Sequence, residues 1–228
     1  YLADPQVTVV TLTITEAGYH RNELGRLDLE NPDVASDVAA IAAGNLHVVR
    51  TGPGKLVAGL IERRRAGAGP ITLISCDNLP DNGTVLSVVL DDMAVSAAPD
   101  LLSYLDTEVG FITTMVDRIT PRASDAVRQA VLDERGVDDL AAVATEPFSE
   151  WVMAGEFRGP HPNWESAGAV ITDDVVPHEL RKLWLLNGAH SLLAYAATIK
   201  GHQTVSDAIA DPIVRGWVDE WWDVAARQ

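Results

Sequence analysis

Over its first three quarters the chain alternates short apolar runs with amphipathic segments. Residues 7–14 are continuously apolar or β-branched, and residues 71–75 are so up to their final serine, a pattern typical of strands buried on both faces of a parallel sheet. Residues 110–115 and 140–144 have the composition of shorter strands. Apolar residues at helical spacing indicate helices at residues 33–43, 55–66, 84 onward and 123–135. The alternation predicts an α/β domain with a parallel sheet.

The hydrophobic period changes near residue 174. Beyond it only the helical period remains, which predicts helices at residues 177–199, 205–210 and 212–226. We therefore expect two domains, residues 1–173 and an all-helical part at residues 174–228.

Two local patterns carry expectations about packing. The arginine run at residues 63–65 falls at a predicted helix end, where such a run is usually solvated. Trp217, Trp221 and Trp222 fit a stripe that faces the core of the last helix.

Composition restricts the class of partner. The 228 residues include 33 acidic and 17 basic side chains, a net charge of −16 that disfavours binding to nucleic acid or to anionic lipid. No apolar run reaches the roughly 18 residues of a membrane span. The single cysteine, Cys76, excludes an internal disulfide and multi-cysteine zinc sites, which suits a reducing cytoplasm. We expect a cytoplasmic protein without a metal, a nucleic-acid partner or a membrane partner.

Polar residues follow three of the predicted strands, at residues 15–16, 76–78 and 116–118. Ligands of open α/β sheets bind beyond the carboxyl ends of the strands, so this shared position predicts a ligand site. Taken singly, Asp77, Asn78 and Asp117 are better explained as turn formers or helix caps, and only their shared position favours a ligand site.

The long predicted helix carries Lys182, Asn187 and His190 among apolar neighbours. At about 100° per residue these side chains lie at roughly 0°, 140° and 80° around the helix, within one arc. A lysine withdrawn from water can act as a general base, and an amide can donate to a developing oxyanion. The alternative is that all three are solvated surface residues.

Several sharper motifs are incomplete. Residues 51–56 lack the first glycine of a phosphate loop and the hydroxyl residue after Lys55, so we interpret them as a helix start. The pair at residues 178–179 opens like a zinc-protease motif, but Lys182 stands where the second histidine is needed.

Five blocks, in order along the chain, resemble the polyol-specific long-chain dehydrogenases. They are residues 12–19, 75–83, 115–121 and 145–148 and the spacing Lys182-x4-Asn187-x2-His190. The resemblance implies a zinc-independent interconversion of a secondary alcohol and a ketone, in a sugar alcohol or sugar acid, with NAD or NADP as cofactor.

The resemblance also implies roles for individual residues. It makes Lys182 the general acid/base, and Asn187 with Asn78 the pair that stabilises the oxyanion. His190, Asn187 and Asp117 are expected to contact the substrate, a polyol, ketose or sugar acid.

Cofactor contacts are assigned to Thr15, Glu16 and Val116 at the sheet edge. The family's glycine-rich cofactor fingerprint does not occur before residue 7, and no initiator Met is present. We therefore expect residues 1–173 to be the C-terminal part of a Rossmann-like dinucleotide-binding domain, and residues 174–228 to be the start of a helical substrate domain. Both are expected to be truncated, and the 228 residues alone to be inactive.

The leading hypothesis is a dehydrogenase of the mannitol–fructose type. A fructuronate or tagaturonate reductase of the same family is the alternative, and it requires a residue that binds the substrate carboxylate. A hypothesis of another class is a non-catalytic sugar- or nucleotide-binding module, in which Lys182 would be dispensable. The choice between NAD and NADP and the oligomeric state stay open.

Overall fold

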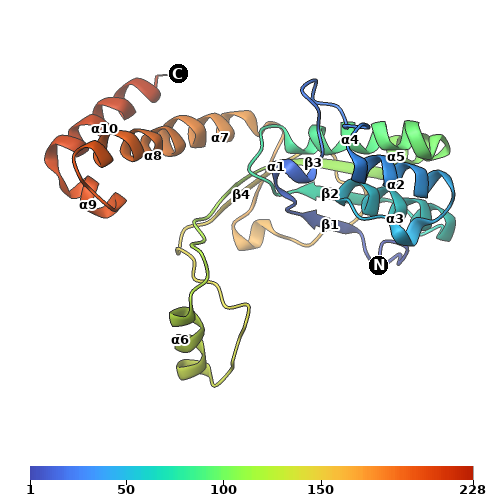
Figure 1. The fold of residues 1–228 in the computed structure, drawn as a ribbon, viewed down its shortest axis with the longest axis horizontal. Coiled ribbons are helices and arrows are strands. Elements are labelled where there is room, and N and C mark those ends of the chain that lie inside the picture. Colours follow the sequence, from blue (N-terminus) through green and yellow to red (C-terminus); the bar gives the residue numbers. More distant parts are fainter. Residues whose placement is uncertain (228) are drawn as a thin grey trace. The chain divides into compact units, whose positions relative to one another are not determined.

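The computed structural model describes residues 1–227 of the chain. They form two compact units, residues 1–173 and residues 174–227. The first unit is built on a five-stranded sheet covered by helices, and the second consists of helices (Figure 1). The predicted order, an α/β domain followed by a helical segment, is confirmed.

The sheet has the strand order β1-β2-β3-β4-β5. Strands β1, β2 and β3 are parallel, β4 runs antiparallel to β3, and β5 is parallel to β4. The prediction of a purely parallel sheet is therefore wrong at one pairing. The strands are Val9–Leu12 (β1), Ile71–Ser75 (β2), Val109–Asp117 (β3), Glu150–Ala154 (β4) and Val170–Thr172 (β5).

The strand expected at residues 140–144 is absent from the described structure. Leu140 and Val143 are exposed, so this apolar run has no sheet to pack against. Its place is taken by β4, which pairs with the second half of β3 from Thr113 to Asp117. Strand β3 thus serves two partners, β2 with its first half and β4 with its second.

The helices of the first unit follow their local signals. Helix α3 begins at the cap residue Thr51, whose hydroxyl accepts a hydrogen bond of 2.9 Å from the Gly54 amide, as expected for residues 51–56. The α-helices are Thr15–Gly18 (α1), Pro32–Ala42 (α2), Gly52–Ala66 (α3), Asn82–Ala97 (α4), Leu102–Glu108 (α5) and Asp125–Arg135 (α6). The 3-10 turns are Leu46–Val48, Pro99–Leu101 and Glu165–Ala167.

The core of the first unit lies between the sheet and helices α3 and α4. Strand β2 is buried along its whole length, as its continuous apolar run predicts. Helix α4 packs against β3 so closely that a Cβ on Gly83 would lie 2.5 Å from the Thr113 amide nitrogen. A glycine is required at that position for this approach.

The second unit is a continuous helical stretch followed by two more helices. Two π-helical turns, Lys182–Asn187 and Leu193–Ala197, widen the long helix expected at residues 177–199. Around them lie Val176–Arg181 (α7), Gly188–Leu192 (α8), Val205–Ala210 (α9) and Pro212–Ala225 (α10).

The predicted tryptophan stripe of α10 is only partly buried. Val214 and Val218 form the buried stripe, and Trp221 packs at its border. Trp217 and Trp222 are 36% and 42% exposed, so the expectation that they face the core is wrong. The two valines are four residues apart and occupy the inner face, which turns Trp217 and Trp222 toward its edges.

The expectation of a solvated arginine run is wrong for Arg63. Its side chain is fully buried and donates to five backbone carbonyls. The acceptors belong to Leu2, Asp4 and the residues at 68–70, at distances of 2.7–3.1 Å. Arg65 remains exposed beside Glu62. Helix α3 turns Arg63 inward, and all five donors of its guanidinium find acceptors there.

Replacing Arg63 tests this carbonyl cage. Arg63→Leu should lower the free energy of unfolding by at least about 3 kcal/mol, because several buried carbonyls lose their donor. The matched control Arg65→Leu should change it by less than about 0.5 kcal/mol. Urea unfolding measures both variants, and a loss below about 1 kcal/mol for Arg63→Leu would contradict the cage.

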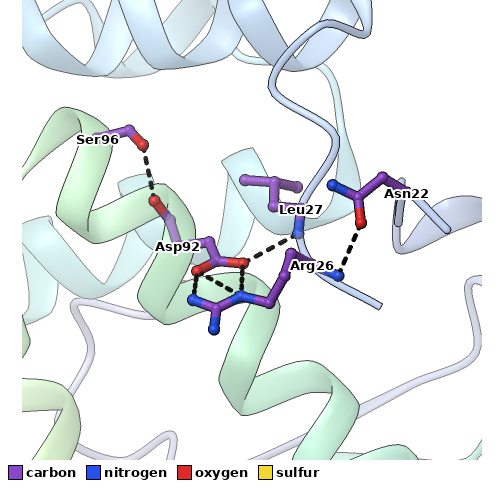
Figure 2. Close-up of polar contacts among 5 residues, drawn as sticks. All are labelled: Asn22, Arg26, Leu27, Asp92 and Ser96. Carbon is purple, nitrogen blue, oxygen red and sulfur yellow. Dashed lines mark hydrogen bonds and ion pairs between the residues drawn. The ribbon is translucent and has the colours of Figure 1, made fainter. Parts of the chain in front are cut away.

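Hydrogen bonds between Arg26 and Asp92 hold the loop before α2 against α4 (Figure 2). The guanidinium forms a forked ion pair with the carboxylate, which also accepts a 3.0 Å bond from the Leu27 amide. Asn22 accepts from the Arg26 amide at 3.1 Å and stiffens the loop from the other side. The bonds from Arg26 hold the pKa of the Asp92 carboxyl below its usual value.

The lowered pKa of Asp92 determines how its contribution to stability changes with pH. Stability from the Asp92 carboxylate is present above the unfolded-state pKa of about 4 and is lost as the pH falls through the lower folded-state pKa. The stability difference between wild type and Asp92→Asn should therefore be largest at neutral pH and shrink in acid. Urea unfolding between neutral pH and about pH 2 measures it.

The neighbouring Asp91 is the control, because burial raises its pKa. Folding disfavours the charged form of Asp91. The stability of the wild type relative to Asp91→Asn should therefore fall as the pH rises. The same pH trend for both variants would contradict the role of Arg26.

Candidate active site

A buried carboxylate organises the edge of the sheet where β1 and β2 end. Asp77 accepts hydrogen bonds from the amides of Ile14 at 3.2 Å and Thr15 at 2.6 Å, and from the Tyr19 hydroxyl at 2.7 Å. Thr15 has a φ of +63°, a left-handed conformation that is unfavourable for a β-branched residue. The bonds to Asp77 compensate for this conformation and end β1 earlier than the apolar run predicts.

The Tyr19 hydroxyl lies between Asp77 and Ser75. Burial, together with the negative charge of Asp77, raises the pKa of Tyr19, so the phenol keeps its proton. Because that proton goes to Asp77, Ser75 donates to the phenol oxygen across the 2.5 Å contact. Asp77 thus stabilises the turn that follows β1, in agreement with its interpretation as a turn former.

Asn82 connects this turn to β3. Its amide donates to the carbonyls of Asp77 at 2.9 Å and Thr114 at 2.8 Å, and its oxygen accepts from the Thr114 amide at 2.9 Å. The side chain is fully buried and its contacts are all internal. The sequence reasoning gave Asn82 no role, although the Asn-Gly pair at residues 82–83 marked the turn.

Cys76 stands next to this network but is not a nucleophile at neutral pH. Burial raises the pKa of its thiol to about 11, and the adjacent Asp77 adds to the effect. The thiol therefore stays protonated, and only a thiolate attacks carbon or binds metal strongly.

The expected ligand-binding residues of the first unit lie at or beyond the ends of the parallel strands. Thr15 and Glu16 begin α1 after β1, and Asn78 is exposed after β2. Val116 and Asp117 end β3 and are half-buried. Because Ile112 is level with Ile74 of β2, Asp117 lies five residues, or roughly 17 Å, further along its strand. At this edge of the sheet, β3 therefore extends well past the end of β2.

An open cavity of about 440 Å³ adjoins α1. It is lined mainly by polar residues, and the Nε of Arg21 is buried with no hydrogen-bond partner among the described residues. Glu16 lies 3.9 Å from the same guanidinium. The lining residues are Glu16, Ala17, His20, Arg21, Asn22, Glu23, Gly25, Asp28 and Asn31.

The π-helical turn Lys182–Asn187 changes the geometry of the second unit. An i→i+5 helix turns by roughly 80–85° per residue, so Asn187 lies roughly 40–65° from Lys182 instead of the 140° expected for an α-helix. Three α-helical residues further on, His190 returns to within roughly 20° of Lys182. Lys182 and Asn187 are half-buried and His190 is exposed. The turn therefore gathers the three polar side chains on a narrower arc than the sequence predicts.

Residues 1–227 contain no group of three or more His, Cys, Asp or Glu side chains placed to hold a metal ion. In the same range, no helix is both long and apolar enough to pass through a bilayer.

Comparison with known proteins assigns both units. Residues 2–166 match the model of the mannitol dehydrogenase Rossmann domain, and residues 174–223 match that of the mannitol dehydrogenase C-terminal domain. These matches confirm the expected Rossmann-like domain and helical domain, and with them the resemblance to polyol dehydrogenases.

Individual relatives agree with this assignment. The chain is 39% identical to D-mannonate oxidoreductase of Escherichia coli, over 94% of the chain and 43% of the relative. It is 41% identical to D-arabinitol 4-dehydrogenase of Ralstonia nicotianae, over 93% of the chain and 44% of the relative.

A solved structure is also similar, the ternary complex of Pseudomonas fluorescens mannitol 2-dehydrogenase with NAD and D-mannitol. It superposes with a TM-score of 0.83 at 38% identity, over 97% of this chain and 44% of that one. The chain thus spans less than half the length of the relatives it matches. Through both of its units, it belongs to the mannitol dehydrogenase family.

Proposed function

We propose that the whole protein carrying this sequence is an NAD- or NADP-dependent oxidoreductase that interconverts a sugar alcohol and its ketose, in the manner of mannitol and fructose. The observation that carries the proposal is the π-helical turn, which brings Lys182, Asn187 and His190 onto one narrow arc of a helix. Family membership and the mannitol complex of a structural relative support the same reaction.

Lys182 is the proposed general acid/base. Oxidation of a secondary alcohol releases a hydride from carbon and a proton from oxygen, so a nearby base must take the proton. In the reverse direction the same ammonium group protonates the carbonyl oxygen. Its half-buried position on the helix suits this role, because a partly dry site strengthens its interaction with a developing negative charge.

Asn187 and Asn78 are the proposed donors to that developing charge. Each amide N–H can hydrogen-bond an alkoxide-like oxygen, which lowers the barrier most when the donors are held in place beforehand. His190 would orient the substrate hydroxyls from the same helix, and Asp117 would accept hydrogen bonds from other hydroxyls.

The cofactor residues are proposed at the edge of β1–β3. Thr15, Glu16 and Val116 there offer a hydroxyl, a carboxylate and an apolar contact, a set that fits the hydroxyl groups of a ribose beside a flat nicotinamide ring. This is the edge at which Rossmann domains bind dinucleotides. NAD or NADP, when bound, accepts or donates the hydride.

A second candidate is reduction of a sugar acid such as fructuronate or tagaturonate. It is favoured by the 39% identity to a relative named D-mannonate oxidoreductase. The two candidates differ at the substrate terminus, where a carboxylate calls for a forked arginine or a lysine. A non-catalytic sugar- or nucleotide-binding module is the alternative from another class, and it predicts that Lys182 is dispensable.

The reaction is tested on the full-length protein. We expect NAD- or NADP-linked turnover of mannitol or arabinitol, and of fructose in the reverse direction, followed by absorbance of the reduced cofactor. Faster turnover of fructuronate or tagaturonate would select the second candidate. Absence of turnover with all five compounds would reject the proposed reaction.

Lys182→Ala tests the general acid/base in the same protein. We expect kcat to fall by at least about 10²-fold, because proton transfer loses its positioned partner. The control is Lys55→Ala, which removes an exposed lysine from α3 and should leave kcat within about twofold. Equal rates for the two variants would mean that Lys182 is not the base.

A further inference from the structure

We propose that Trp221 and Trp222 of α10 are positioning residues, which hold open the π-helical turn that carries Lys182 and Asn187. The inference rests on the proposed function, in which these two side chains act on the substrate. It assigns to the tryptophan pair a task other than packing.

The pair contacts two consecutive carbonyls of the turn. The indole nitrogen of Trp221 donates to the carbonyl of Trp184 at 2.8 Å, and that of Trp222 donates to the carbonyl of Leu185 at 2.9 Å. The donors come from a helix 37 residues further along the chain. Both acceptors lie in the middle of the π-helical turn, between Lys182 and Asn187.

Outside donors at these carbonyls favour the wide form of the turn. In an α-helix each carbonyl points along the axis to the amide four residues on. A π-helical turn interrupts that ladder, which is why it is rare. Carbonyls that tilt away from the axis toward other donors are a recognised cause of helix distortion. Two indole N–H groups compensate for the weakened ladder where the widening occurs.

Gly188 makes room for this contact. A Cβ at position 188 would lie 2.6 Å from the Trp221 ring, too close for any other residue to be accommodated without movement. The Trp221 ring also packs against the Trp184 ring, with centroids 6.3 Å apart. The glycine that directly follows Asn187 therefore admits the indole to the turn.

The exposure of Trp222 indicates that its indole N–H contributes more to this contact than burial of its ring does. Trp222 is 42% exposed, so its ring contributes little to the core, yet its N–H is bonded to backbone. The core of this unit is made by other residues, among them Val214 and Val218 on α10. These valines pack α10 into the core of the unit, with Trp221 at the border of the same cluster.

The form of the turn sets the angle around the helix between the Lys182 and Asn187 side chains. If the turn relaxed to an α-helix, Asn187 would rotate from roughly 40–65° to about 140° away from Lys182. A proton acceptor and an oxyanion donor that far apart around the helix would converge less well on one substrate oxygen. Misplacement of this size costs about tenfold to a hundredfold in rate.

The test uses Trp221→Phe, Trp222→Phe and the double variant in the full-length protein, because phenylalanine keeps a ring and removes the donor. We expect the double variant to lower kcat at least about tenfold with KM for cofactor within about twofold. The control is Trp217→Phe on the same helix. The Trp217 ring lies 5.7 Å from the Lys200 ammonium, and this variant should leave kcat unchanged within about twofold. A double variant with wild-type kcat would overturn the proposal.

A background that carries both Lys182→Ala and Asn187→Ala separates positioning from general damage. If the indoles act through these two side chains, the double tryptophan variant should lose less than about twofold more activity in that background. Equal losses with and without Lys182 and Asn187 would overturn the proposal and indicate a merely structural role.

Amide hydrogen exchange keeps the test independent of the substrate. A change in exchange rate confined to residues 182–190 in the double variant is the expected result, and unchanged exchange there would overturn the proposal. A wild-type protein without turnover would instead reject the proposed function, and exchange would still decide whether the indoles hold the turn.

Discussion

The carboxylate of Asp77 is the interaction on which the sheet edge depends. One buried side chain fixes the end of β2, the left-handed turn at Thr15 and the hydroxyl of Tyr19. Asn82 then joins the same turn to β3. The residues proposed to meet cofactor and substrate on this unit, such as Asn78, inherit their position from that network. Asp77 thus contributes to the candidate site by fixing the positions of its neighbours.

The two units solve the problem of placing polar groups in different ways. In the first unit, buried side-chain hydrogen bonds hold loops at the ends of strands, where the backbone has few partners of its own. In the second, the helix backbone itself is deformed, and the deformation changes which side chains share a face. Both solutions use partners far apart in sequence, Asp77 with Thr15 in one unit and Trp222 with Leu185 in the other.

Sequence patterns predicted the elements whose signals are local. Strand β2 is a mainly apolar run because both of its faces are buried, and helix α3 begins at a capping threonine two residues before a proline. Strand β4 was missed because it forms by pairing with the far half of β3 and with β5, and neither pairing leaves a local signal. The π-helical turn was missed because residues 182–187 have an ordinary helical pattern and the donors at their carbonyls come from α10. Arg63 was misjudged because charge alone does not reveal which helix face a residue occupies.

The cage around Arg63 has a consequence for how this part of the chain can vary. Its acceptors are peptide oxygens at residues 2, 4 and 68–70, so the identities of those side chains are not specified by the contact. Only the path of the main chain and one guanidinium are constrained. Substitutions can therefore accumulate in both loops while a single arginine preserves their mutual placement.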